Sequence, residues 1–181
     1  KIEHTKMRDL IFGTAGSPIS TNGTGSENGI KRVKELGLGA MELEFVRGVR
    51  ISEERAIKVG EIAKKNNVFL TAHGPYYVNL NSKDPKINDA SIVRILDTAR
   101  ACDAADGYSI TFHAAYYMKQ DPEKVYEKVK KAMKEILNTL KNESINLWVR
   151  PEVTGKRTQF GSLKELIRLS QEVENVMPCI D

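Results

Sequence analysis

Four short apolar runs, each followed by a side chain that can bind a metal, constrain this chain more than any other feature. Runs of this length and composition are typical of buried strands, and stretches with helical periodicity separate them. The runs and the side chains that follow them are 68–72 before His73, 108–112 before His113, 147–151 before Glu152 and 176–180 before Asp181. Parallel strands need long crossover connections, which the helical stretches supply. We therefore expect the carboxyl ends of parallel strands to bring these four side chains to one rim.

The same alternation extends over the whole chain. Two further apolar runs, 10–12 and 40–45, precede these four, and five stretches with helical spacing separate the six runs. The distance from one marked residue to the next is of the order of the roughly 31 residues that one strand–helix unit occupies in a (β/α)₈ barrel. We predict an α/β fold, a TIM (β/α)₈ barrel of which this chain is an incomplete N-terminal portion with six strands and about five helices.

An incomplete barrel has consequences for the ends of its sheet. We expect residues 1–181 to form a single domain, the N-terminal three-quarters of a barrel, with residues 1–6 as a native tail or an expression remnant. The first strand, near Ile11, and the sixth, near Met177, should then have open edges. Open edges favour pairing, so we expect another chain to pair across the gap.

Composition limits the class of protein. The 181 residues suffice for one domain with a sizeable core, and 40% hydrophobic with 29% charged residues is typical of a soluble globular protein. No run of eighteen apolar residues and no signal-peptide core is present, so no membrane association is expected. Cys102 and Cys179 form no metal-pair spacing or disulfide framework, which favours a reducing, cytoplasmic location. The net charge of +4 permits a nucleic-acid partner without requiring one.

The side chains at the strand ends match a metal-ligand set. Two imidazoles with carboxylates commonly bind zinc, so we predict His73, His113, Glu152 and Asp181 as metal ligands, with Glu152 able to bridge two ions. Each residue alone has another explanation: a structural hydrogen bond for a histidine, an ion pair with Arg150 for Glu152, a helix cap for Asp181. Their recurrence at successive strand ends favours the metal site.

Two other stretches near the expected rim leave alternatives open. Glu42 and Glu44 share one face of the 40–45 strand, either a solvated face or one inside the barrel near the site. The Gly-, Ser- and Thr-rich stretch 13–28 is expected to be a loop, lying over the mouth of the site or acting as an ordinary linker. Ser26 is expected to cap the helix that follows.

Several motifs of the chain resemble those of the endonuclease IV family. They are, in order, 73–80 (HGPYYVNL), 112–113 (FH), 151–152 (PE) with Gly155, 159–161 (QFG) and 179–181 (CID). The stretches 13–16 (GTAG) and 41–45 (MELEF) are similar to the archaeal branch of that family. The resemblance covers essentially the whole chain. Two departures are the Ala-Ala after His113, where Pro-Gly is common in the family, and the Val-Thr after Glu152, where Asn-Thr is common.

This resemblance implies a zinc barrel that cleaves the DNA backbone 5′ to abasic sites, with up to three zinc ions in the complete protein. It implies that His73 and His113 bind one zinc, that Glu152 bridges to a second and is catalytic, and that Asp181 binds the second. Tyr76 would belong to a loop that enters the DNA minor groove. Ligands expected after the sixth strand are absent from this sequence, which leaves open how many ions the chain holds and whether it is active alone.

Two other functions remain open. A sugar isomerase or epimerase resembling xylose isomerase would also use strand-end Glu, Asp and His with a divalent metal, in a closed polar pocket without a basic rim. A binding or structural barrel that has lost its metals would be non-catalytic. Basic and aromatic residues on the expected rim favour DNA containing abasic sites as the partner. They are Arg47, Arg50, Tyr76, Tyr77, Lys156 and Arg157.

Overall fold

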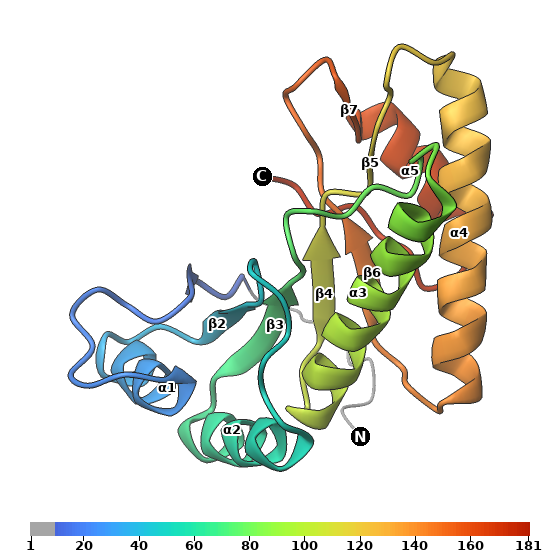
Figure 1. Ribbon diagram of the computed structural model, residues 1–181. Helices are drawn as coiled ribbons and strands as arrows, with labels where there is room; N and C mark the ends of the chain where they lie inside the picture. The colour runs from blue at the N-terminus through green and yellow to red at the C-terminus, as the bar shows by residue number, and fades with distance from the viewer. Residues whose placement is uncertain (1–9) are drawn as a thin grey trace.

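The computed structural model describes residues 10–181 (Figure 1). Five parallel strands form one sheet: β1 (Gly13–Ala15), β2 (Ala40–Glu44), β3 (Phe69–His73), β4 (Ser109–Phe112) and β6 (Trp148–Pro151), in that spatial order. Five helices alternate with them: α1 (Ser26–Glu35), α2 (Glu53–Asn66), α3 (Pro85–Ala104), α4 (Pro122–Asn142) and α5 (Leu163–Glu172). The α/β fold of an incomplete TIM barrel is therefore confirmed; the expected tail at residues 1–6 lies outside the described residues.

Local capping signals account for where most helices begin. The side chains of Ser52, Asp84, Asp121 and Ser162 accept hydrogen bonds from backbone N–H groups in the first turns of α2, α3, α4 and α5. Such caps satisfy donors that have no partner within the helix. In α1 the predicted cap at Ser26 is wrong, because the N-cap is Gly25 and no side chain caps that helix.

The core lies between one face of the sheet and the apolar stripes of the helices. Met41 and Leu43 of β2 are buried there, and alternation along a strand puts Glu42 and Glu44 on the opposite, barrel-interior face. Side chains of the helices complete this core. They include Ile30, Val33, Val59, Ile95, Val129, Ile136, Leu166 and Leu169. The core thus fixes which side chains face the barrel interior.

The first strand is displaced from its predicted position. We predicted it at residues 10–12, but Gly13–Ala15 pairs with Ala40 and its neighbours, while Leu10 and Phe12 are largely exposed. A Cβ on Gly13 would lie 2.3 Å from the Ala40 carbonyl oxygen, so the strands can approach this closely only because residue 13 is glycine. The predicted 13–28 loop accordingly begins with three strand residues.

The predicted sixth strand is present only in part. Residues 175–179 run parallel to β6, with backbone hydrogen bonds that include Met177 N–H to the Val149 carbonyl and Cys179 N–H to the Pro151 carbonyl. They form two isolated bridges rather than a continuous strand. Pro178 has no N–H to contribute to a ladder. The prediction of six strands in the sheet is therefore wrong: the described residues give five, and the sixth segment lies beside them.

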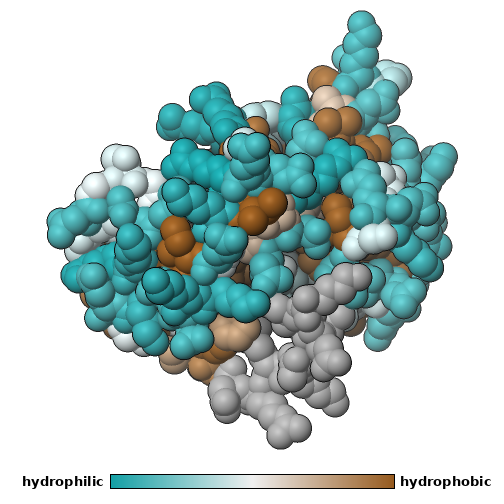
Figure 2. Space-filling view, turned by 90° about the horizontal axis from the view of Figure 1, so that it is seen from below, coloured by the Kyte–Doolittle hydropathy of each residue, from teal (hydrophilic) through white to brown (hydrophobic). Residues whose placement is uncertain are grey.

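An unpredicted pair of short strands stands above the sheet. β5 (Ala115–Tyr116) and β7 (Gln159–Phe160) pair antiparallel beyond the carboxyl ends of β4 and β6 (Figure 1). The opposite end of the molecule, seen in Figure 2, carries mainly hydrophilic side chains with small, separate apolar patches. No described helix is long and apolar enough to span a membrane.

The strand β1 lies at the edge of the five-stranded sheet. In the described residues it pairs only with β2, and pairing of this edge with another chain stays a prediction.

Candidate metal centre

Three neighbouring strands place the candidate ligands. His73 is the last residue of β3, His113 directly follows β4, and Glu152 directly follows β6. The register aligns His73 with Thr111 and Phe112 with Pro151, so the three strands end at nearly the same height. Parallel strands bring such side chains together at their carboxyl edge.

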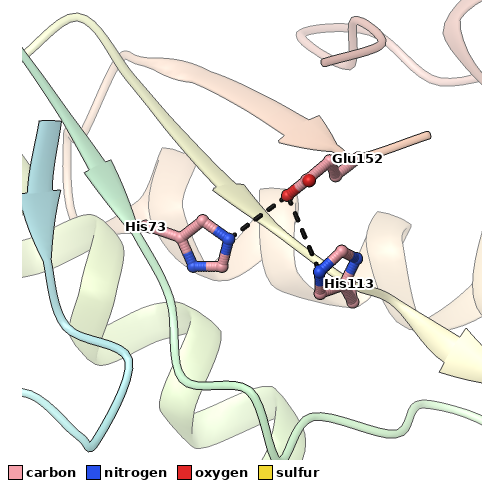
Figure 3. Close-up of side chains that lie close together, drawn as sticks. All are labelled: His73, His113 and Glu152. Atoms are coloured by element: carbon pink, nitrogen blue, oxygen red, sulfur yellow. Dashed lines mark hydrogen bonds and ion pairs between the residues drawn. The ribbon is translucent and has the colours of Figure 1, made fainter. Parts of the chain in front are cut away.

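The three side chains converge on one carboxylate oxygen (Figure 3). His73 Nε2 lies 3.2 Å from Glu152 Oε2, and His113 Nε2 lies 3.9 Å from the same oxygen. One potential ligand atom from each residue lies within 4.8 Å of the other two. The side chains of His73 and Glu152 are only 11% and 10% exposed, and that of His113 is 28% exposed. The centre is thus mostly withdrawn from water but open on the His113 side.

The hydrogen bonding of His73 shows that this group fits a cation. Its Nδ1 lies 2.7 Å from the Gly74 carbonyl oxygen, to which only a protonated Nδ1 can donate. In the neutral ring the Nε2 lone pair then faces a carboxylate oxygen, and two electron-rich atoms at this distance need a proton or a metal ion between them. Two imidazole nitrogens and a carboxylate suit zinc, whereas magnesium prefers an all-oxygen set.

Hydrogen bonds and charges within the site shift the pKa values of His73 and Glu152. Burial lowers the pKa of His73, but hydrogen bonds from its ring to Glu152 and to the Gly74 carbonyl outweigh burial, and the net pKa is raised. The hydrogen bond with His73 lowers the pKa of Glu152 against the effect of burial, and His113 and Asp181 lower it further. The carboxylate is therefore ionised and competent as a ligand.

Asp181 lies beside this group rather than within it. It is exposed, and it is close enough to Glu152 to affect the pKa of that carboxyl. It does not belong to the cluster of three whose ligand atoms lie within 4.8 Å. The structure thus brings three of the four predicted ligands together and puts the fourth next to Glu152.

Glu42 is a neighbouring group whose location the sequence pattern left open. It is half-buried on the interior face of β2, where Thr71 Oγ1 donates to its Oε2 at 3.4 Å. Burial raises the pKa of Glu42, the nearby Glu44 raises it further, and His73 opposes the shift. Strand alternation was the only signal for this location, and it could not decide between the interior of a barrel and a solvated face.

The predicted DNA-contacting residues occupy the same rim. Tyr76 and Tyr77 are 56% and 50% exposed. The Tyr76 ring lies 5.5 Å from the His73 ring, centroid to centroid, whereas the Tyr77 ring lies beneath the guanidinium of Arg94, 4.6 Å away. Tyr76 therefore borders the candidate metal centre, and Tyr77 is directed toward α3. Further residues on exposed loops are basic. They are Arg47 and Arg50 after β2, and Lys156 and Arg157 before β7.

Comparison with known proteins gives the family. Residues 30–181 match the sequence profile described as xylose isomerase-like TIM barrel. The chain belongs to this family. An uncharacterized protein from Methanocaldococcus jannaschii is 42% identical over 175 residues, which cover 95% of this chain and 61% of that protein. A probable endonuclease 4 from Clostridium botulinum is 26% identical over 170 residues, covering 86% of this chain and 60% of that protein.

Solved structures confirm the fold of this family member. A D-psicose 3-epimerase has a TM-score of 0.76 at 19% identity and covers 95% of this chain, which covers 63% of the epimerase. Endonuclease IV from Thermus thermophilus has a TM-score of 0.69, also at 19% identity, covering 95% of this chain and 62% of that one. The chain therefore spans about three-fifths of the length of these proteins. Since both enzyme classes share the barrel, fold alone does not separate their activities.

Proposed function

We propose that the protein is a zinc-dependent DNA repair endonuclease that cleaves the phosphodiester backbone 5′ to abasic sites. The observation that carries this proposal is the convergence of His73, His113 and Glu152 at the carboxyl edge of the sheet. The sequence similarity to a probable endonuclease 4 supports DNA as the substrate. Exposed aromatic and basic residues around the same rim support it further.

Each residue of the centre has a role in this proposal. His73 is held in one orientation by the Gly74 carbonyl, so its Nε2 would be presented as a ligand. Glu152 would be shared between two ions, with His73 and His113 on the first and Asp181 on the second. When bound, zinc would supply an activated water and stabilise the departing oxygen. Tyr76 would contact the DNA beside the cleaved bond, where it borders the His73 ring.

The remainder of the barrel belongs to the same proposal. The chain spans 61% of the Methanocaldococcus jannaschii relative, and eight strand–helix units close a barrel. We therefore treat residues 1–181 as one domain that further units complete, and those units would supply the remaining ligands of up to three zinc ions. A cytoplasmic location fits two free cysteines among the described residues.

A second candidate function is a metal-dependent sugar isomerase or epimerase. The observation that favours it is Glu42, a half-buried carboxyl group on the interior face of β2, beside a candidate metal ligand. A carboxylate accepts hydrogen bonds from sugar hydroxyls and repels phosphate. The exposed arginines and tyrosines of the rim favour the endonuclease.

One experiment separates the two candidates. The full-length protein is incubated with zinc and a labelled duplex containing one abasic site, with and without chelator, and in parallel with a panel of free ketoses. The endonuclease proposal predicts a nick immediately 5′ to the abasic site that the chelator abolishes, and no change in the sugars. Metal-dependent epimerisation of a ketose with an intact duplex would instead establish the second candidate.

A further inference from the structure

A pocket beside the metal centre is not used by the proposed mechanism. It has a volume of about 590 Å³ and lies against the β5–β7 pair. Its lining includes Asn79, Tyr116, Met118, Lys119, Arg157 and Thr158, and we call it the hairpin pocket. Three separate loops, those after β3, β4 and β6, contribute to it. Tyr116 is three residues after His113, so their Cα atoms are at most about 11 Å apart.

Hydrogen bonds fix the walls of the hairpin pocket before any ligand arrives. Asn79 Oδ1 accepts hydrogen bonds from the backbone N–H groups of Tyr116 and Asn81, at 3.2 and 3.1 Å, and Asn79 Nδ2 donates to Met118 Sδ at 3.6 Å. Asn81 Nδ2 in turn donates to the Tyr116 carbonyl at 2.8 Å. The loop after β3 therefore holds the loop after β4 in place. A preorganised pocket loses less entropy when it binds a ligand.

The turn at one edge of the hairpin pocket has an unusual backbone. Met118 and Lys119 have φ angles of 50° and 59°, and Gln120 N–H donates to the Tyr117 carbonyl across them. Two consecutive left-handed residues match a type I′ turn, which normally takes glycine or asparagine. Side chains other than these are uncommon at such positions and occur where the surroundings hold the backbone. The strained turn places a thioether and an ammonium group at the pocket edge.

The surface of the hairpin pocket combines apolar and basic character. Tyr116 is 36% exposed and Met118 45% exposed, so ring and thioether surfaces are available for contact. Lys119 and Arg157 are exposed and also line the pocket, and no carboxylate lines it in the described part of the chain. A pocket that combines an apolar, partly aromatic surface with two cations is complementary to a nucleotide, because the base stacks and the phosphates are anionic.

We propose that the hairpin pocket binds one nucleotide of the DNA strand, with the base against Tyr116 and Met118 and the flanking phosphates at Lys119 and Arg157. This inference rests on the proposed function for the identity of the nucleic acid. The limit of about 11 Å between the Cα atoms of Tyr116 and His113 equals about three base steps, at roughly 3.4 Å per step along a strand. The bound nucleotide would therefore lie within about three positions of the cleaved bond and would fix the register of the DNA.

Substitutions in the hairpin pocket test this proposal. Tyr116→Ala removes the ring and Tyr116→Phe keeps it, while Arg157→Glu reverses one charge. Lys131→Glu, on the exposed face of α4, is the matched charge control outside the pocket. Fluorescence anisotropy measures binding to a labelled abasic duplex at several salt concentrations, and nicking of the same duplex is followed separately. Zinc content and Tm establish that each variant is folded.

We expect Tyr116→Ala to weaken binding about fivefold or more, in keeping with the loss of one base stack, and Tyr116→Phe to bind as wild type. Arg157→Glu should weaken binding. It should also reduce the slope of log K against log salt concentration by about one, the value for one phosphate contact, while Lys131→Glu should change this slope less. If the wild type binds the duplex without nicking it, the proposed activity fails, but weaker binding by the variants still supports the pocket. Unchanged binding by Tyr116→Ala and Arg157→Glu, or no DNA binding by the wild type, would overturn the pocket proposal.

Discussion

Glu152 is the residue on which the candidate metal centre depends most, because both imidazoles face one of its oxygens. Glu152→Gln keeps the size of the side chain and removes its charge, and a neutral amide balances a cation poorly. We expect zinc affinity and abasic-site nicking each to fall at least about tenfold, since even the outer partners of metal ligands contribute roughly 10–100-fold. Isothermal titration with zinc and a nicking assay measure the two effects.

The control for this prediction is Glu135→Gln on the exposed face of α4. It removes the same charge far from the strand ends and should leave zinc affinity unchanged. Equal zinc affinity for Glu152→Gln and Glu135→Gln would mean that the carboxylate is not a ligand.

The protonation of His73 predicts how zinc stabilisation depends on pH. The folded-state pKa of His73 is raised, so its protonation stabilises the metal-free protein most below the unfolded pKa of about 6.5, and this stabilisation is lost as pH rises through the higher folded value. Zinc must displace that proton. The increase in Tm caused by zinc should therefore be small in mild acid and should grow as pH rises through the His73 pKa. Thermal unfolding with and without zinc, over about pH 5.5–8.5, measures it.

A His73→Gln variant is the control for the pH dependence, because it cannot hold the proton with which zinc competes. Its zinc-induced change in Tm should be smaller and should vary less with pH in this range. A zinc effect with the same pH profile in wild type and variant would assign the titration to another group.

At the scale of single residues, the sequence located part of the centre. His73, His113 and Glu152 could be predicted because each follows an apolar run, and parallel strands bring such positions together. The location of Glu42 could not be predicted, since strand alternation gives two faces without saying which one is interior. The tautomer of His73 depends on the Gly74 carbonyl, a contact that only the folded loop creates.

At the scale of elements, the loop after β3 carries two adjacent tyrosines, and we expect their substitution to affect DNA binding differently. Tyr76 borders the His73 ring, whereas Tyr77 contacts Arg94 of α3. We expect Tyr76→Ala to weaken binding to an abasic duplex about fivefold or more, the range for loss of one stacked base, and Tyr77→Ala to have a smaller effect. Anisotropy titration measures the binding, and metal analysis should give unchanged zinc content in both variants. Unaltered DNA binding by Tyr76→Ala would exclude the contact.

The start of α5 supports a different prediction, about stability. Glu165 accepts hydrogen bonds from the Ser162 N–H and from the Tyr117 hydroxyl, the latter at 2.7 Å. Glu165→Ala breaks the capping box and leaves the partly buried hydroxyl without this acceptor, so unfolding free energy should fall by about 1–2 kcal/mol. Urea denaturation measures it. The neighbouring exposed Lys164→Ala should change it by less than about 0.5 kcal/mol, and equal effects of the two substitutions would mean that the hydrogen bonds of Glu165 do not stabilise this helix start.

Local signals in the sequence mark the starts of several helices, whereas tertiary contacts decide some of the strands. Caps at Ser52, Asp121 and Ser162 are local signals that lie within four residues of the groups they satisfy. The β5–β7 pair could not be predicted, because two-residue strands carry no periodicity and their partners are far apart in the sequence. The shift of β1 to Gly13 depends on contact with Ala40, which is also a tertiary effect.

At the scale of the whole molecule, the order of helices and strands was predictable and the limits of the sheet were not. Alternating periodicities predicted successive strand–helix units, and all five strands of the sheet lie in chain order. The segment at 175–179 has apolar strand composition, yet it makes only isolated bridges to β6. Whether such a segment becomes a strand depends on the neighbour on its other side, about which local sequence carries no information.

We propose that His73, His113 and Glu152 hold a metal ion at the mouth of the barrel, and the rest of the proposed function depends on this ion. Crystals of the zinc-loaded protein, measured on both sides of the zinc absorption edge, test it most directly. We predict an anomalous difference peak about 2.0–2.2 Å from one nitrogen of each imidazole and from a Glu152 oxygen. A zinc-loaded crystal with no peak between these three side chains, or with its only peak elsewhere on the surface, would contradict the claim.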